Sequence, residues 1–178
     1  MDAIAEVTAE QGYAATSITD IVNRARVARK SLYECFSGKE ELFLATFDAA
    51  VEEAFKRVEE AGAQAAGGWD EQVRAALAAF LGYVAERPDL ARMCMLEAPS
   101  AAPAMSERYE AAMQRFVALL GAIAPHGDEL PETIDETLIG GVAWIVHRQI
   151  RRDEAESALD LLPELSEFLI APFAASGD

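Results

Sequence analysis

Apolar residues near the start of the chain recur at helical spacing in two short segments joined by a tight connection. In the first segment, Ile18 and Ile21 lie on one face and predict a helix over residues 17–25. In the second, Leu32 is the inward apolar position of a compact helix over residues 28–34. Two short helices joined in this way are typical of a helix-turn-helix, whose second helix enters the major groove of DNA.

Polar residues at the expected helix starts support this interpretation. Ser17 stands three positions before Asp20 and predicts a capping box at the start of the first helix. Ser37 and Glu40 repeat this spacing and predict the start of a third helix. Lys39 then falls in the first turn of that helix, where unpaired backbone amides and a positive side chain together suit a phosphate group.

The remainder of the chain has the pattern of longer, alanine-rich helices, without the alternation that is typical of strands. Asp70 and Asp160 are the expected N-caps, and Pro131 suits a first helical turn. Glycine and proline mark the expected loops at residues 62–68, 99–103 and 125–130. The expected helices cover residues 40–61, 70–87, 89–97, 104–124, 131–152 and 160–172. The predicted fold class is all-α.

Taken in order, the residues near the N-terminus resemble the TetR family of one-component transcriptional regulators. The residues that carry the resemblance are Gly12-Tyr13, Thr16-Ser17-Ile18, Asp20-Ile21, Ser31-Leu32-Tyr33, Phe36 and Lys39-Glu40-Glu41-Leu42. The resemblance implies a three-helix DNA-binding domain with the helix-turn-helix over residues 1–46. It further implies a C-terminal helical domain for ligand binding and dimerisation over residues 47–178.

The resemblance also implies which side chains meet DNA. Residues at the positions of Ser17, Tyr33 and Lys39 touch the DNA backbone in the family. The segment of the second short helix that approaches base edges contains Arg29, Lys30 and Ser31.

Three positions depart from the family's usual pattern. Arg26 and Lys30 stand where glycine is usual or frequent, and Ala28 stands where serine or threonine is usual. Ala28 removes an N-cap hydroxyl, a change that costs about 0.5–2 kcal/mol, and Arg26 is strained if its φ is positive. Arg26 and Lys30 add positive charge on the side where DNA lies, so Arg26 is also a candidate DNA-binding residue. Met1 stands where the family's first helix is already under way, so the family's basic arm either precedes this sequence or is absent.

The formal net charge of −16, from 31 acidic and 15 basic residues, at first argues against a nucleic-acid partner. Between Arg24 and Lys39, however, there are five basic residues and one acidic residue, so this segment carries +4 and the rest of the chain −20. The Debye length is about 8 Å at physiological salt, so acids on a distant domain are largely screened from a phosphate held at this segment.

The last two expected helices have broad apolar faces, which can be buried in the chain's own core or against a second copy. We expect both uses, because Gly140-Gly141 permits close backbone approach and the resemblance implies a homodimer through the final two helices. A dimer places two recognition helices about one DNA turn apart, which suits a palindromic operator. The residues assigned to the dimer interface are Leu138, Val142, Ile145, Leu165, Phe168 and Leu169.

Bulky and adaptable apolar side chains in the middle helices suit a pocket for a small-molecule effector, with a few polar tips to orient it. Ordinary core packing is the alternative for each of them, since such stripes are frequent in cores. The residues assigned to the pocket are Phe80, Tyr83, Met93, Met95, Tyr109, Met113, Phe116, Trp144 and His147.

Catalysis has little support in the sequence. His126 and His147 have no nucleophile or metal-ligand set at recognisable spacing, so we expect no enzyme, metal site or cofactor, and an exposed loop position for His126. Cys35 and Cys94 are too few for a disulfide scaffold. No signal peptide or apolar run of roughly 18 residues is present, which indicates a cytoplasmic protein with no membrane partner.

These patterns predict a ligand-responsive regulator that binds double-stranded DNA as a homodimer. We expect a repressor that a small, mostly apolar molecule releases from a palindromic operator. The alternative is a helical sensing or partner-binding module that has lost DNA binding, in line with the uncapped second helix and the strong acidity. A third possibility is a carrier of apolar ligands, which needs the pocket without the DNA-binding surface.

Overall fold

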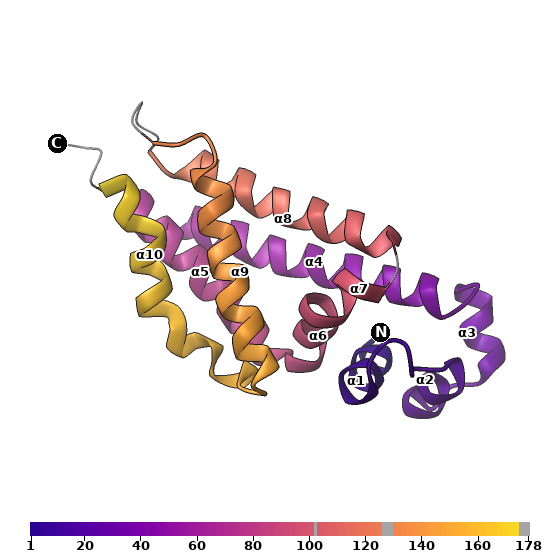
Figure 1. Cartoon of the computed structure of the whole chain (residues 1–178). Coiled ribbons are helices and arrows are strands. Elements are labelled where there is room, and N and C mark those ends of the chain that lie inside the picture. The colour runs from indigo at the N-terminus through magenta and orange to yellow at the C-terminus, as the bar shows by residue number, and fades with distance from the viewer. Residues whose placement is uncertain (102, 126–129, 175–178) are drawn as a thin grey trace.

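The computed structural model describes residues 1–101, 103–125 and 130–174, and their regular elements are helices (Figure 1). This confirms the predicted all-α class. The elements are, in chain order, α1 (Asp2–Gln11), α2 (Ile18–Ala25), α3 (Arg29–Cys35), α4 (Lys39–Gln64), α5 (Trp69–Glu86), α6 (Pro88–Arg92), the π-helical turn η1 (Met93–Glu97), α7 (Ala98–Ala101), α8 (Pro103–Ile123), α9 (Ile134–Arg151), the 3₁₀ segment η2 (Ala155–Leu161) and α10 (Leu162–Ala174).

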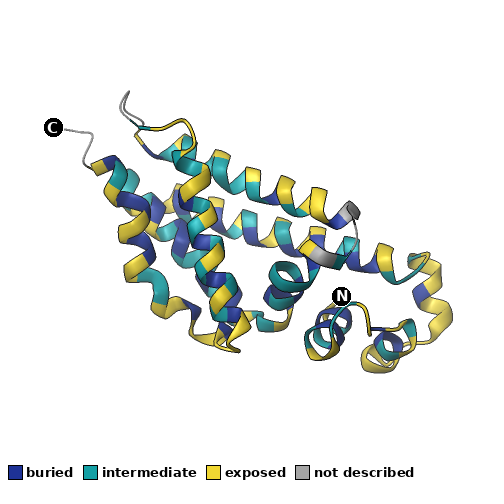
Figure 2. Ribbon diagram, viewed as in Figure 1, coloured by how far each residue is buried: buried dark blue, intermediate teal, exposed yellow. Residues whose placement is uncertain are grey.

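The long helix α4 connects the two parts of the molecule. Helices α1 to α3 lie at its N-terminal end, and α5, α8, α9 and α10 form the helical body along the rest of it (Figure 1). Buried residues lie on the sides of the helices that face one another, while the outer faces are exposed (Figure 2). The predicted boundary near residue 46 therefore falls inside one continuous helix.

Two apolar clusters hold these helices together, and each fully buried leucine or phenylalanine contributes roughly 1.5–3 kcal/mol relative to an exposed one. The first cluster joins α1 to α4 with α6, η1 and α8, and includes Ile4, Ile21, Leu32, Phe43, Phe47, Leu90, Met93 and Met105. The second cluster fills the helical body and includes Leu77, Leu81, Val84, Leu138, Val146, Leu165 and Leu169. The first cluster makes the helix-turn-helix part and the helical body one continuous packing unit.

The two short helices of the helix-turn-helix start as their sequences predict. The backbone N–H of Asp20 donates to Ser17 Oγ at 3.2 Å, and the Ser17 N–H donates to Asp20 Oδ2 at 3.0 Å, which confirms the capping box. The pKa of the Asp20 carboxyl is lowered by the bonds that it accepts from Ser17, first from the hydroxyl and then from the backbone N–H. Ala28 occupies the N-cap position of α3, so the methyl group there leaves the first turn of α3 without a side-chain cap from this residue.

The predicted capping box of Ser37 with Glu40 is wrong by one residue. Helix α4 begins at Lys39 with Gly38 as its N-cap, so the third helical position is Glu41. The N–H and the hydroxyl of Ser37 both donate to Glu41 Oε2, at 2.7 and 2.6 Å, and the pKa of the Glu41 carboxyl is lowered by these bonds. Lys39 still falls in the first turn, as predicted.

Several other predicted boundaries are corrected by tertiary packing. The expected break at Gly62 is inside α4, where this buried residue packs on α5: a Cβ here would be in ordinary van der Waals contact, 3.5 Å from the Gln72 carbonyl oxygen. Gly68 rather than Asp70 is the N-cap of α5, and Pro99 lies within α7 instead of a loop.

Near the C-terminus, the helices also begin at other residues than the sequence predicts. Helix α9 begins at Ile134 with Thr133 as its N-cap, three residues after the expected start at Pro131. Asp160 lies in η2 rather than at a helix cap, and α10 begins at Leu162. Residues 126–129, including the histidine expected in an exposed loop, lie outside the described residues.

Arg26 adopts the left-handed conformation at the C-cap of α2, with φ 55° and ψ 41°. A side chain in this region costs roughly 1–2 kcal/mol, whereas glycine adopts it without this penalty. The turn between α2 and α3 is therefore strained by the departure from glycine that the sequence contains.

We predict that Arg26→Gly raises the free energy of unfolding by about 1 kcal/mol relative to Arg26→Ala. Both variants remove the same positive charge, but only the glycine relieves the backbone strain. Urea unfolding of the two proteins measures the difference. Equal stabilities would contradict a strained turn at this position.

Candidate functional site

Helix α3 presents a polar, positively charged face to solvent. Leu32 is buried against the first apolar cluster, while Arg29, Lys30 and Ser31 are exposed. Tyr33 is 47% exposed, and the Arg29 guanidinium lies 5.6 Å from the centre of its ring. The short helix thus anchors one apolar side chain and leaves the side chains of the predicted reading surface accessible.

Lys39 lies beside this face, at the start of α4, and is held by Tyr13. Its ammonium donates to the Tyr13 carbonyl oxygen at 2.8 Å and lies 4.1 Å from the centre of the Tyr13 ring. An ammonium has three donors, so this bond leaves further donors for an anion. Ser17 and Arg26 are also exposed at this end of the molecule, although the Ser17 hydroxyl donates to Asp20 Oδ2 at 2.6 Å.

One of the five basic residues counted in the sequence does not belong to this exposed surface. Arg24 donates to Glu6 Oε2 at 2.9 Å and to Glu10 Oε2 at 2.6 Å, which ties α2 to α1. The local charge of +4 therefore overstates what a ligand meets, because the two glutamates lie outside the segment that was counted. The basic surface consists of Arg26, Arg29, Lys30 and Lys39.

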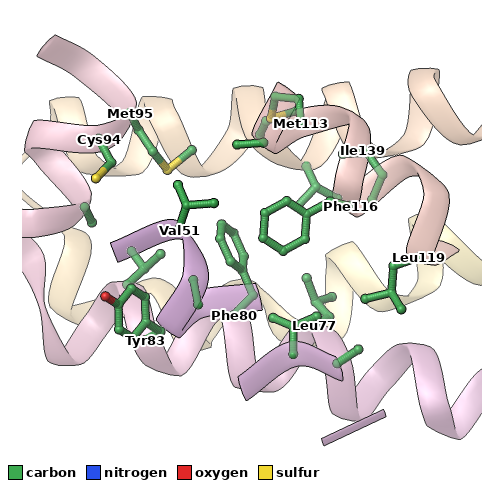
Figure 3. A pocket seen from close by; sticks show the side chains of 18 of the residues that line it. Val51, Leu77, Phe80, Tyr83, Cys94, Met95, Met113, Phe116, Leu119 and Ile139 are labelled. Atoms are coloured by element: carbon green, nitrogen blue, oxygen red, sulfur yellow. The ribbon is translucent and has the colours of Figure 1, made fainter. Parts of the chain in front are cut away.

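The helical body contains a cavity of about 160 Å³ (Figure 3). Side chains from α4, α5, α6, η1, α8, α9 and α10 line it. Six of the nine residues predicted for a pocket are among the lining residues, namely Phe80, Tyr83, Met95, Tyr109, Met113 and Phe116. Apolar stripes at helical spacing were therefore a useful guide to this region.

The other three pocket assignments are wrong. Met93 is fully buried in the first apolar cluster, one residue before the part of η1 that reaches the cavity. Trp144 is 61% exposed on the outer side of α9. His147 stacks on Trp144 with ring centres 5.6 Å apart, and its Nδ1 is buried without a hydrogen-bond partner among the described residues. Trp144 thus faces away from the cavity, and His147, one turn beyond the lining residue Ala143, packs on the Trp144 ring and does not line the cavity.

None of the residues that the sequence assigned to the pocket belongs to α4, although this helix forms part of the cavity wall. Phe47, Val51, Ala54 and Val58 all line the cavity, at helical spacing along one face. The same pattern is expected for a helix that packs in an ordinary core. The sequence therefore contains no signal that distinguishes a cavity-lining position of α4 from a core position. Cys94 also lines the cavity, and burial raises the pKa of its thiol to about 12, which keeps it neutral at physiological pH.

The lining is almost entirely apolar. None of the described lining residues is charged, and its polar atoms come from Tyr83, Tyr109 and Cys94. Burial raises the pKa of both tyrosine hydroxyls, which therefore remain neutral donors at physiological pH. The cavity thus suits an uncharged group that packs against aromatic and methionine side chains.

Four of the six residues assigned to a dimer interface are corrected by the packing within one chain. Leu138, Val142, Leu165 and Leu169 are buried in the second apolar cluster, and Val142 and Leu169 also line the cavity. Ile145 is partly buried, while Phe168 is 42% exposed. The outer apolar face of α9 and α10 is therefore formed by Phe168 and Trp144 rather than by the broad stripe that was predicted.

In the part of the chain that the structure describes, no three histidine, cysteine, aspartate or glutamate residues come together to hold a metal ion. Within the same residues, no helix is both long enough and apolar enough to cross a membrane.

Comparison with known proteins finds a family model that matches the N-terminal residues of the chain. Residues 1–46 match the family model of bacterial regulatory proteins, tetR family. A search of curated protein sequences gives no match.

Solved structures match over nearly the whole chain. The fatty acid degradation regulator FadR from Bacillus halodurans is 18% identical, with 94% of this chain and 91% of that chain covered and a TM-score of 0.83. FadR from Bacillus subtilis in complex with stearoyl-CoA is 20% identical, with 96% and 95% covered and a TM-score of 0.83. A TetR-like transcriptional regulator from Rhodococcus sp. RHA1 is 24% identical, with 93% and 90% covered and a TM-score of 0.73. The chain therefore has the same fold as these regulators.

Proposed function

The chain belongs to the TetR family of DNA-binding transcriptional regulators, and on this premise we propose that it is a repressor released from its operator by a small, mostly apolar molecule. The family is non-enzymatic, so the protein is a regulator and not an enzyme. The observation that carries the proposal is the joint presence of an exposed basic α3 and an apolar cavity whose wall is formed by the same helix α4 that follows α3.

We assign DNA binding to residues 1–46 and effector binding and dimerisation to residues 47–178. On the DNA side, Ser17, Tyr33 and Lys39 contact phosphates, and Arg29, Lys30 and Ser31 approach base edges. Arg26 adds charge at the turn that precedes α3. Support comes from their common exposure at the α1 to α3 end of the molecule, with Lys39 at a helix N-terminus where backbone amides also favour an anion.

The acidity of the chain is compatible with this assignment. The helical body lies along α4 away from α3 (Figure 1), and its charges are screened over a Debye length of about 8 Å at physiological salt. Many of its acids are also paired locally, for example Glu52 with Arg115 at 2.9 Å and Glu86 with Arg57 at 2.7 Å. Screening and local pairing together leave little repulsion between the acids of the helical body and a phosphate held at α3.

The effector is inferred from the lining of the cavity. A cavity of about 160 Å³ is close to the size that holds a benzene-sized group. A longer apolar molecule must widen it, which displaces the walls formed by α4 and η1. The Bacillus subtilis FadR structure contains stearoyl-CoA, which supports acyl chains as candidates for this chain's effector.

Release from DNA follows from a difference in affinity between two states. A ligand that fits only the widened cavity shifts the equilibrium toward the state that holds it. If that state sets the two DNA-binding domains of a dimer at the wrong spacing, DNA and ligand weaken each other's binding by the same factor. The continuous helix α4 joins both sites and is the element that carries the displacement.

A homodimer is the proposed active form. The side chains of Trp144 on α9 and Phe168 on α10 are 61% and 42% exposed, so both present a large apolar surface to solvent. Gly141 lies beneath Phe168, where a Cβ would be only 2.9 Å from the Phe168 ring, so the glycine lets α10 approach α9. Two copies joined at this face place two α3 helices on one side for a palindromic operator.

We predict that footprinting with the purified protein detects a protected site in the DNA upstream of its own gene. Lys39→Glu weakens binding to all sequences alike, because a phosphate contact carries no sequence information, whereas Arg29→Gln or Lys30→Gln changes the sequence preference. Lys56→Glu, the same charge change on the helical body, is the control. Equal effects from the three variants at residues 29, 30 and 39 would contradict these roles.

We predict that acyl-CoA compounds and other apolar molecules raise the melting temperature of the wild-type protein by roughly 5–10 °C at concentrations well above Kd. Ala112→Phe fills the cavity and abolishes the shift, since Ala112 lines it. Ala111→Phe, the adjacent exposed position of α8, keeps the shift and serves as the control. An equal shift in the two variants would place the binding site elsewhere.

We predict that Trp144→Glu converts the dimer to a monomer in sedimentation equilibrium, because a carboxylate at the centre of an apolar interface must be desolvated. Val27→Glu, at a side chain that is 48% exposed on the opposite end of the molecule, leaves the dimer intact. A wild-type protein that sediments as a monomer at micromolar concentration would refute the assembly.

A further inference from the structure

Tyr13, in the connection between α1 and α2, is held from two sides. Its backbone N–H donates to Glu97 Oε2 at 2.9 Å, across a sequence separation of 84 residues. Its carbonyl oxygen accepts the bond from Lys39 at 2.8 Å, and its ring packs edge-on against Phe43 with ring centres 4.6 Å apart. The same residue therefore touches the helical body and the lysine proposed to contact phosphate.

Glu97 is the last residue of the π-helical turn η1, whose Cys94 and Met95 line the cavity. A π-helical turn is wider than an α-helical one and is found frequently at functional sites. Only Leu96 thus separates the lining residue Met95 from the residue whose carboxylate binds the Tyr13 amide. The turn also packs on α1 and α4, so a displaced η1 moves against the DNA-binding part of the chain.

The backbone around Tyr13 is shaped to receive this carboxylate. Gly12 has a positive φ of 80°, which ends α1 and turns the Tyr13 amide toward Glu97. A Cβ at Gly12 would lie 3.5 Å from Glu97 Oε2, so the carboxylate rests directly against the loop. Thr16 closes the loop, because its hydroxyl donates to the Gly12 carbonyl oxygen at 2.8 Å.

Another bond also joins the two parts, but it lies in solvent. Arg87 Nη2 donates to Asp2 Oδ1 at 2.5 Å, with the two side chains 41% and 76% exposed. Exposed ion pairs contribute little, whereas a hydrogen bond from an amide to a partly buried carboxylate is stronger. The Glu97 bond is therefore the better candidate for transmitting a displacement.

We propose that Glu97 is a positioning residue that couples the cavity to DNA binding: it fixes Tyr13, and Tyr13 in turn fixes the ammonium of Lys39. A molecule that widens the cavity displaces η1, draws the carboxylate from the Tyr13 amide and releases Lys39 from its phosphate-binding position. This inference rests on the proposed function and names the contact through which that function is regulated.

The local contact is tested by amide hydrogen exchange at Tyr13. Glu97→Ala raises the exchange rate about tenfold, because the amide loses a hydrogen bond to a charged group. Glu97→Gln keeps an acceptor oxygen and most of the protection. Asp2→Asn, which weakens the exposed bond between the same two parts, leaves the Tyr13 rate unchanged. No change in Glu97→Ala would overturn the proposal.

The coupling is tested with the cavity filled by substitution, so that no effector needs to be known. Binding to a random-sequence DNA duplex at low salt is measured for Ala112→Phe, with Ala111→Phe as the control. When Glu97 is present, Ala112→Phe weakens DNA binding about fivefold or more. A fivefold change is about the smallest effect that is typical of two coupled sites. In the Glu97→Ala background the same substitution has less than a twofold effect. An equal effect in both backgrounds would overturn the proposal.

The outcomes separate this inference from the proposed function. A wild-type protein that binds no DNA defeats the proposed function. The contact between the cavity and Tyr13 is then tested by the amide hydrogen-exchange rate at Tyr13, which we expect to rise in Ala112→Phe. Unchanged exchange in that variant would overturn the inference. Thermal melting verifies that each variant is folded, and Met113→Trp, another substitution at a lining residue, replaces Ala112→Phe if the latter unfolds.

Discussion

The long helix α4 belongs both to the first apolar cluster and to the wall of the cavity, and this continuity constrains how the two parts of the molecule move. This helix contains 26 residues and is about 39 Å long at 1.5 Å per residue. Its first turns bury Phe43 and Phe47 in the cluster that also holds α1 to α3, and its later turns form a wall of the cavity. Because its backbone hydrogen bonds are continuous, the DNA-binding part cannot move independently of the cavity wall.

The basic residues around α3 give this strongly acidic chain a local positive surface. A chain with a net charge of −16 binds a polyanion only if its few free cations are gathered away from its acids. Arg24 pairs with two glutamates of α1, while Arg26, Arg29, Lys30 and Lys39 lie together around α3 and the first turn of α4. Arg148, Arg151 and Arg152 form a second exposed group, at the C-terminal end of α9 in the helical body. The first group lies beside the helix proposed to enter the major groove, so it supplies the contacts with phosphate in the proposed function.

Local signals in the sequence predicted the helix-turn-helix well, because a capping box such as that of Ser17 depends on neighbours three residues apart. The direction in which each helical side chain points, into the core, the cavity or solvent, was harder to predict, since tertiary packing decides it. Trp144 is exposed and Val142 lines the cavity, because residues two apart on a helix point in nearly opposite directions. The pairing of Arg24 with α1 and of Glu97 with Tyr13 joins residues that are distant in the chain and leave no local pattern.

The salt dependence of DNA binding shows whether the basic residues around α3 contact phosphates. If the cations around α3 and α4 neutralise phosphates, the logarithm of the binding constant falls linearly with the logarithm of the salt concentration, by about 0.9 for each phosphate contacted. We expect a specific duplex from the upstream region to bind with a slope of this steepness. The absence of binding even at the lowest salt would contradict the account and favour a helical sensing module without DNA affinity.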